Sequence, residues 1–152
     1  MPFTPSPGFI SSLTAAPTGR SSATLVALGL NTVYTPRATG RVAVFASGVI
    51  GNGTSTDGFT YNLYYGTGAA PANNDAVSGT AIASLQTVTS VVTSALTVPF
   101  ALHGAVENLV ADAINSRGAT VAGTTYWFDI MFSYVTGGTV TLTNVNLLVF
   151  EF

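Results

Sequence analysis

The segment TTYWFDIMFSYV, residues 124–135, alternates with a period of two. One set of alternate positions is aromatic or aliphatic throughout: Tyr126, Phe128, Ile130, Phe132 and Tyr134. The other set is mixed: Trp127, Asp129, Met131 and Ser133. Successive side chains of a strand point to opposite faces. The alternation therefore predicts a β-strand whose aromatic face lies inside the protein.

Other β-branched or apolar runs occur along the chain, and turn residues separate them. The expected strands lie in ATLVALGL, GRVAVFASGVI, FTYNLYYG and LQTVTSVVTSALTVPFAL, and the expected loops are GNGTSTDG and TGAAPANNDAVSG. Gly137-Gly138 joins the aromatic strand to the terminal one, which predicts a tight hairpin. The whole pattern predicts an all-β fold, an antiparallel β-sandwich of the jelly-roll type with about eight strands.

One segment competes with this pattern. In GAVENLVADAIN, residues 104–115, apolar residues recur at helical spacing. A short helix and an irregular crossover are both compatible with it.

Residues 1–22 differ from the rest, because four prolines stand there in a Ser/Thr-rich context. Proline disfavours helix and central strand, so we expect an extended N-terminal arm, followed by a sandwich domain over 23–152. A disordered tail is the alternative. As an ordered arm, the segment is expected to lie outside its own sandwich, on a neighbouring subunit or a capsid. The apolar side chains able to anchor it there are Phe3, Phe9, Ile10 and Leu13.

The composition excludes several classes of protein. Charged residues make up only 7% of the chain, lysine is absent and the net charge is −2, so nucleic acid is not an expected partner. A surface this poor in charge, on a chain that is 47% hydrophobic, indicates an assembly. No apolar run approaches 18 residues, so no membrane span is expected. The start, MPFTPSPGF, does not resemble a signal peptide, and synthesis in a host cytoplasm is expected.

Candidates for catalysis are few. His103 is the only histidine, and it could form an acid–base pair with Glu107 or Asp129. A lone histidine in an apolar strand more often has a structural or interface role, which we favour. The chain has no cysteine, and no cofactor, metal site or enzymatic activity is expected.

Two loops and a few aromatic residues leave further binding hypotheses. Asp57 with Asn52, or Asp75 with Asn73 and Asn74, could supply oxygen ligands, although turn formation explains these residues better. Tyr64, Tyr65 and Trp127 could stack on a sugar, although alternation within strands favours a core or interface role.

Residues 35–152 resemble small structural proteins of tailed bacteriophage virions. The similarity is carried by TGRVAVFASGVIGN, FTYNLYYGTGAAPANND, VPFAL, GTTYWFDIMF and GGTVTLTNVNLLVFEF, and it is interrupted over 104–123. The resemblance implies a jelly roll of the tumour necrosis factor/C1q shape, a homotrimer, location in the virion and contact with a major capsid protein or another virion protein. Head decoration and reinforcement is the expected role. The alternative is a fibre or tail module that binds a receptor or glycan through loops 51–58 and 66–79.

The last strand fits a trimer. In NVNLLVFEF neither face suits water, and the single acid Glu151 falls among apolar residues. A partner subunit is the expected cover for the second face. The interface candidates are Trp127, Met131, Leu148, Phe150 and Phe152. We expect Trp127 or Met131 at a subunit contact or under a loop.

Overall fold

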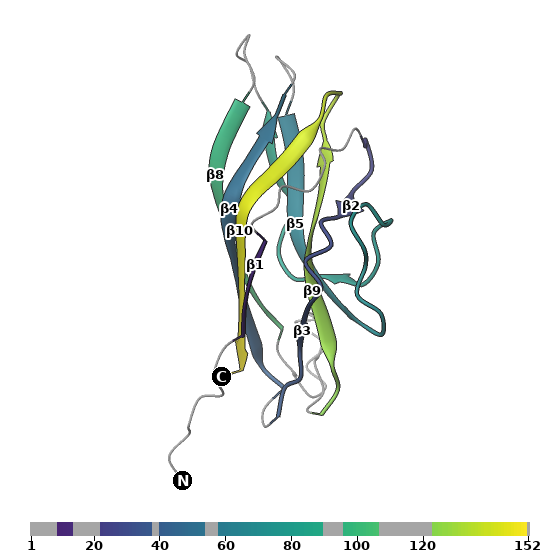
Figure 1. Ribbon diagram of the computed structural model, residues 1–152, viewed down its shortest axis with the longest axis vertical. Coiled ribbons are helices and arrows are strands. Elements are labelled where there is room, and N and C mark those ends of the chain that lie inside the picture. Colours follow the sequence, from purple (N-terminus) through teal and green to yellow (C-terminus); the bar gives the residue numbers. More distant parts are fainter. Residues whose placement is uncertain are drawn as a thin grey trace.

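The computed structural model describes residues 9–13, 22–37, 40–53, 58–89, 96–106 and 123–151. These residues form strands and connecting turns, with no helix among them. The strands are β1 (Phe9–Leu13), β2 (Val26–Ala27), β3 (Thr32–Tyr34), β4 (Val42–Asn52), β5 (Gly58–Thr67), β6 (Thr80–Ala81), β7 (Gln86–Thr89), β8 (Leu96–Val106), β9 (Tyr126–Tyr134) and β10 (Val140–Glu151). They build two sheets that face each other along the long axis of the molecule (Figure 1).

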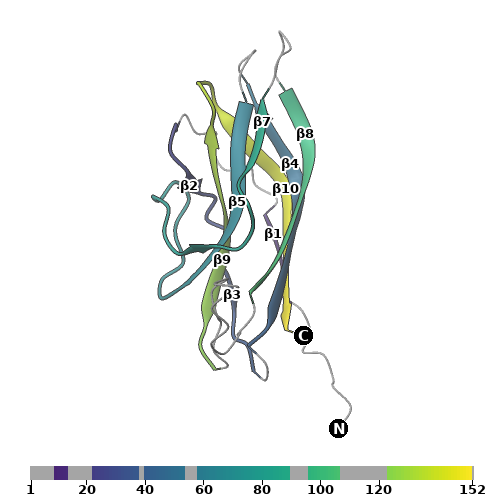
Figure 2. The same ribbon diagram turned by 180° about the vertical axis from the view of Figure 1, so that it is seen from behind.

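The strand order is that of a jelly roll. One sheet has the order β1-β10-β4-β8; the other has β2-β9-β5-β6, with β3 also paired to β9 and β7 to β5. All pairs are antiparallel. When β2 with β3, and β6 with β7, are each taken as one interrupted strand, the chain has eight strands. Consecutive strands lie in opposite sheets, except that β5 and the β6–β7 strand are neighbours in the same sheet (Figure 2). The predicted fold class is confirmed.

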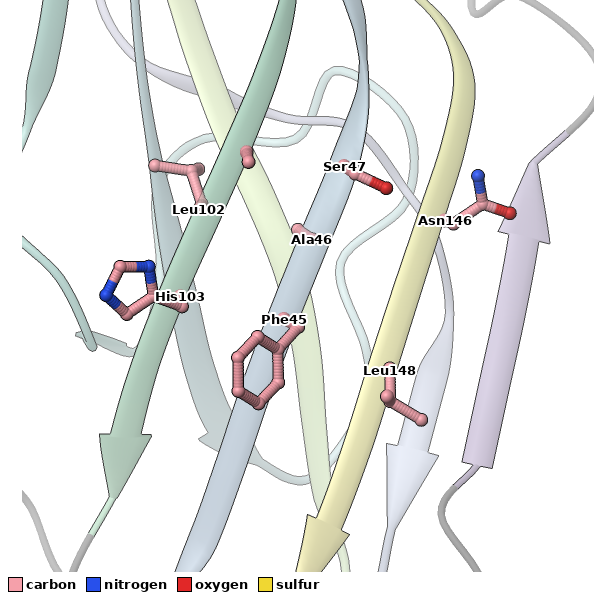
Figure 3. A pocket seen from close by; sticks show the side chains of 8 residues that line it. Phe45, Ala46, Ser47, Leu102, His103, Asn146 and Leu148 are labelled. Carbon is pink, nitrogen blue, oxygen red and sulfur yellow. The ribbon is translucent and has the colours of Figure 1, made fainter.

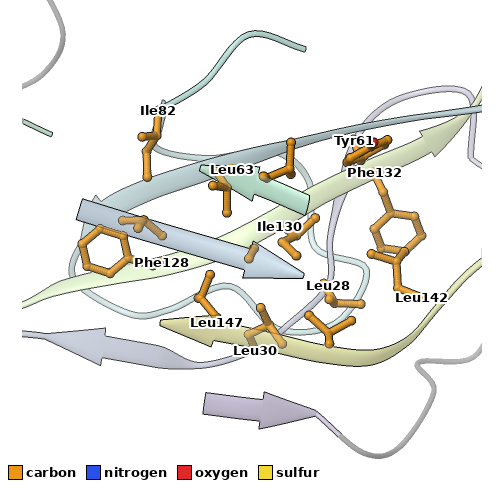
Figure 4. Packing of buried hydrophobic residues seen from close by; sticks show 14 of the residues in the cluster. Leu28, Leu30, Tyr61, Leu63, Ile82, Phe128, Ile130, Phe132, Leu142 and Leu147 are labelled. Carbon is orange, nitrogen blue, oxygen red and sulfur yellow. The ribbon is translucent and has the colours of Figure 1, made fainter. Parts of the chain in front are cut away.

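The core lies between the sheets, and β9 supplies its aromatic wall. Tyr126, Phe128, Ile130 and Phe132 belong to the main buried cluster, as the alternation of β9 predicted. Phe59, Tyr61, Leu63 and Tyr65 of β5 join them from the same sheet. Leu142 and Leu147 of β10 pack against this layer from the opposite sheet (Figure 4). The register that we inferred for β9 is therefore correct.

A β-bulge in β10 lets the apolar side chains of both halves of the strand point into the core. The pairing with β4 shifts between Thr143 and Asn146, and Asn144 takes a left-handed backbone angle, φ 52°. The extra residue lets Leu142 and Val145 both point inward although they are three apart. Without it, one half of the strand would turn its apolar side chains to the outside.

Glu151 lies inside the sandwich, at the end of β10. Its carboxylate accepts hydrogen bonds from the backbone N–H groups of Arg37 (2.7 Å) and Gly40 (2.8 Å), and the residue is only 5% exposed. The lone acid therefore ties the loop between β3 and β4 to the last strand. Buried charge is tolerated here because backbone donors replace water.

Asp129 has a similar role on β9. Its side chain accepts hydrogen bonds from the N–H groups of Gly29 (2.8 Å), Leu30 (3.3 Å) and Ile130 (2.7 Å). Burial raises the pKa of this carboxyl group to about 6, although the three N–H donors act in the opposite direction. The sequence predicted a single strand over residues 23–30. The structure has β2, an irregular segment and then β3, and the Gly29 and Leu30 N–H groups that bind Asp129 belong to that irregular segment.

Trp127 and Met131 lie under loops of their own chain. With Ala27 they form a second buried cluster, against which Leu25, Tyr64 and Ala70 pack. Trp127 fits a slot between two glycines, since a Cβ atom on Gly66 or on Gly79 would come within 2.5 Å of the indole ring. The indole N–H donates to the carbonyl oxygen of Thr67. The expectation of a covering loop holds, and neither residue is exposed for a subunit contact.

The expected hairpin at Gly137-Gly138 is not formed. β9 and β10 are consecutive but belong to opposite sheets. The turn between them crosses the end of the sandwich, with Gly138 at φ 84°, and Asn52 donates a hydrogen bond to the carbonyl oxygen of Gly137. A glycine pair supplies the required backbone angle but does not distinguish a hairpin from a crossing between sheets.

Part of the N-terminal arm belongs to the sandwich. Residues Phe9–Leu13 pair with β10 from Val149 to Val145 and form the edge strand of that sheet, one of the eight strands of the jelly roll. The expectation that the whole arm lies outside its own sandwich is therefore wrong for these residues. Prolines flank this short segment but are absent from it, so the backbone donors of an edge strand are present. Phe3 lies outside the described residues.

β8 is the opposite edge of the same sheet. It continues through Val106, so a helix cannot begin at Gly104, and residues 107–115 of the predicted helix lie outside the described residues. Pro99 stands within this strand and lacks an N–H group, which suits an edge position. In the described part of the chain, no helix is long and apolar enough to cross a membrane.

Candidate interaction surface

The sheet β1-β10-β4-β8 has an outer face that is almost free of charge. We call the outward positions of β4, β8 and β10 the Phe45 face; they alternate with the buried positions of the same strands. Its residues are Ala43, Phe45, Ser47, Val49, Thr97, Pro99, Ala101, His103, Ala105, Thr141, Thr143, Asn146, Leu148 and Phe150. None is Asp, Glu, Lys or Arg. The one acid on these strands, Glu151, points inward.

Large side chains form a ridge across this face. The pairing register places Leu148 of β10 opposite Phe45 of β4, and Phe45 opposite His103 of β8. The Phe45 ring stacks on His103 with centroids 6.3 Å apart, and on Phe150 with centroids 5.7 Å apart and planes 3° from parallel. Phe45 is nevertheless 46% exposed. Stacking of this kind restricts the rotation of the Phe45 side chain.

Small side chains form a trough beside the ridge. One row further along the strands, Asn146 lies opposite Ser47, and Ser47 opposite Ala101. A hollow of about 470 Å³ opens over this row and is bounded by the ridge residues (Figure 3). On the other side of the ridge, a second hollow of about 710 Å³ extends over Ala43 and Ala105 toward Gln86. The ridge thus stands between two depressions.

The surface is apolar for an exposed sheet. An antiparallel sheet that faces water normally presents polar residues on that side. Here the polar groups are hydroxyls, one amide and one imidazole, and an exposed phenylalanine stands among them. A face of this kind is typical of protein–protein contact rather than of binding to a charged ligand.

Two interface candidates from the sequence lie on this face. Leu148 and Phe150 are half-buried and take part in the ridge and its stacking. Phe152 lies outside the described residues, whereas Trp127 and Met131 are buried in their own subunit. The sequence analysis missed Phe45. Its signal was a single large residue among the small outward positions of VAVFAS.

The acid–base pair of His103 with Asp129 does not form. His103 is exposed on the Phe45 face, and Asp129 is buried beneath the loop that follows β2, on the outer side of the other sheet. Glu107, the other candidate partner, lies outside the described residues. Among those described, no group of three His, Cys, Asp or Glu side chains could hold a metal ion.

The Asn/Asp loop has the turn role that we favoured. Asp75 accepts a hydrogen bond from the N–H of Ala72 (2.7 Å), Asn73 donates to the carbonyl oxygen of Leu28 (2.9 Å), and Asn74 has φ 74°. The Asn73 hydrogen bond fastens the loop of residues 68–79 onto the segment after β2, and the Asp75 hydrogen bond lies within the loop. Asn52 likewise donates to the carbonyl oxygen of Gly58, while Asp57 is not described.

The proposed sugar-stacking residues do not form an exposed platform. Tyr65 and Trp127 are 6% and 3% exposed, and Tyr64 is partly covered where it packs on the Trp127 cluster. The core interpretation, which the alternation of β5 and β9 favoured, describes them correctly.

Comparison with known proteins gives distant structural likeness only. No protein-family model matches the chain, and no curated protein matches it. It is similar to a solved structure of infectious bursal disease virus, Gx strain, with a TM-score of 0.46 and 15% identity over 97% of this chain and 32% of the other. A crystal structure of the VP2 subviral particle of infectious bursal disease virus gives a TM-score of 0.40 and 12% identity, over 95% of this chain and 36% of the other. The chain spans about a third of the length of these structures.

Proposed function

We propose that this chain is a non-enzymatic structural protein of a virus particle, which assembles as a homotrimer through the Phe45 face and decorates the capsid. The observation that carries the proposal is an uncharged sheet face with a 46% exposed phenylalanine, Phe45, that stacks on Phe150. The resemblance of residues 35–152 to phage virion proteins supports the location.

The size of the face supports self-association. Its three long strands have 11 or 12 residues each. With a spacing of about 4.8 Å and a rise of about 3.3 Å per residue, they cover about 500 Å² in projection. A stable interface buries about 800 Å² on each partner. The projected area of the face is therefore about three fifths of that figure, before the additional surface of its protruding side chains is counted.

The absence of charge favours a second copy as the partner. An interface between copies of one chain brings this face against parts of the same face, so a face with charges of one sign would repel its neighbours. The Phe45 face has no such penalty. In a closed ring of three copies, the face of each copy would cover part of one neighbour, and the other neighbour would cover part of it.

Light scattering of the purified protein tests the trimer. We expect the mass of three chains of 15.5 kDa each at micromolar concentration. Phe45→Arg should give a monomer, because it places an unpaired cation in an apolar contact. Val33→Arg is the matched control, since Val33 is equally exposed at 47% but lies in the other sheet, and this variant should remain trimeric. A wild-type monomer would overturn the proposed assembly.

Virus particles that lack the gene test the decoration role. Electron microscopy should reveal missing density on the head lattice, and the particles should release their genome at lower temperature. Density missing only from a fibre or tail would contradict head decoration and favour the receptor-binding alternative.

A further inference from the structure

The Phe45 face carries both halves of a packing contact. Its ridge, Leu148, Phe45 and His103, runs across three strands, and its trough, Asn146, Ser47 and Ala101, runs parallel to it one row away. Rows on the same face are two residues apart along a strand, a distance of about 7 Å. A second copy displaced by about that distance would place its ridge over the trough of the first.

The dimensions of the trough suit an aromatic ring. The hollow measures about 470 Å³ and is open to solvent on its outer side. Its floor is made of small side chains from β4 and β8, with Asn146 and Leu148 as a wall on β10 (Figure 3). Phe45 is already restricted by its stacking on His103 and Phe150, so less side-chain freedom remains to be lost on docking.

We propose that Phe45 of one copy inserts into the Ser47–Ala101–Asn146 trough of a second copy. This rests on the proposed self-association through the same face and specifies its packing. Burial of an exposed aromatic ring in a preformed hollow is the kind of contact that dominates the free energy of protein interfaces. Because ridge and trough occupy different places on the face, every copy both inserts a ring and receives one.

Filling the trough tests this packing. Ala101 is exposed, so Ala101→Phe should leave the fold intact while closing the hollow. We expect its dissociation constant to rise at least tenfold in sedimentation experiments. Val33→Phe is the matched control, since it adds the same ring at an exposed strand position of the other sheet, away from the Phe45 face, and it should assemble as wild type does. If Ala101→Phe fails to fold, Ser47→Tyr takes its place, because it fills the trough from β4 and should weaken assembly in the same way.

A mixing experiment makes the test specific for ridge and trough. Phe45→Ala removes the ridge but keeps the trough, whereas Ala101→Phe keeps the ridge. Each variant alone should assemble more weakly than wild type. At a concentration at which each alone is monomeric, an equimolar mixture of the two should form mixed pairs in native mass spectrometry with one partner isotopically labelled. Assembly of Ala101→Phe as tight as that of wild type would overturn the packing while leaving the proposed function intact. A wild-type monomer would overturn both.

Discussion

At the scale of single residues, two buried carboxylates organise the loops of this sandwich. Asp129 accepts three backbone N–H groups, and Glu151 accepts those of Arg37 and Gly40. Both acids lie at strand positions where an apolar residue would leave nearby amide donors without acceptors. An unsatisfied buried donor costs about 1–3 kcal/mol, which explains why acids occupy these positions in a chain with so few charges.

The pKa of Asp129 makes stability depend on pH. The value is raised from 3.8 to about 6 in the folded chain, so the folded state retains a proton between about pH 4 and pH 6 that the unfolded state has released. Stability from this group is therefore present below about pH 4 and is lost as the pH rises through 6. Two pKa units correspond to about 3 kcal/mol.

Urea unfolding at fixed protein concentration, from pH 4 to pH 7.5, measures this effect. Asp129→Asn cannot titrate, so the free energy of unfolding of wild type minus that of the variant should fall by about 3 kcal/mol across the window. A difference that stays constant or rises with pH would contradict the assignment.

Glu151→Gln tests the other carboxylate. A glutamine has one acceptor oxygen, and its NH₂ group would face a backbone donor, so either Arg37 or Gly40 loses a hydrogen bond. We expect a loss of about 1–3 kcal/mol in the free energy of unfolding by urea denaturation. Thr87→Ala, at an exposed position of β7, is the control and should change stability by less than about 0.5 kcal/mol.

At the scale of elements, the bulge in β10 decides which side chains reach the core. Asn144 provides it with a left-handed backbone angle that asparagine tolerates better than most residues. Asn144→Val should lower the free energy of unfolding by about 1–2 kcal/mol, because a β-branched side chain is strained in this conformation. Thr141→Val, on the same strand with ordinary backbone geometry, should have little effect. If both variants lost the same free energy of unfolding, the left-handed backbone angle at Asn144 would have no special contribution to stability.

At the level of strands, only part of the fold could be predicted from the sequence. Period-two alternation identified β5 and β9 and their inward faces, because burial on one side leaves a direct trace in residue order. It could not place consecutive strands in opposite sheets, and Gly137-Gly138 therefore indicated the wrong connection. The Asp129 contacts that divide β2 from β3 join residues about a hundred positions apart, which no local pattern reveals. The ridge on the Phe45 face depends on register across three strands and was missed for the same reason.

β1 is the element whose position differed most from expectation. A chain that lacks residues 2–13 loses the ladder on β10 and exposes that edge. We expect a loss on the order of 2 kcal/mol, or about 4–8 °C in Tm for a chain of this size, with increased aggregation. A chain that lacks only residues 2–8 keeps β1 and should melt within about 2 °C of wild type by circular dichroism. Equal melting of the two truncated chains would show that the ladder contributes little.

At the scale of the whole molecule, the distribution of charge predicts how assembly responds to salt. Contacts between charged surfaces weaken as ionic strength rises, but the Phe45 face has no Asp, Glu, Lys or Arg. The dissociation constant of the oligomer should therefore change by less than about threefold between 50 mM and 500 mM NaCl in sedimentation experiments, and ammonium sulfate should lower it. A tenfold weakening in NaCl would indicate an interface elsewhere.

Pro99 in β8 affects whether strands of other copies can add to the edge of this sheet. Strand-to-strand addition at the end of a sheet has no natural limit, since each added copy offers a new end, and fibres result. A residue without an N–H group makes that end a poor template. Contacts between broad faces, in contrast, can close on themselves after a few copies. Pro99 thus makes the β8 edge of this sheet a poor site for strand-to-strand addition of another copy.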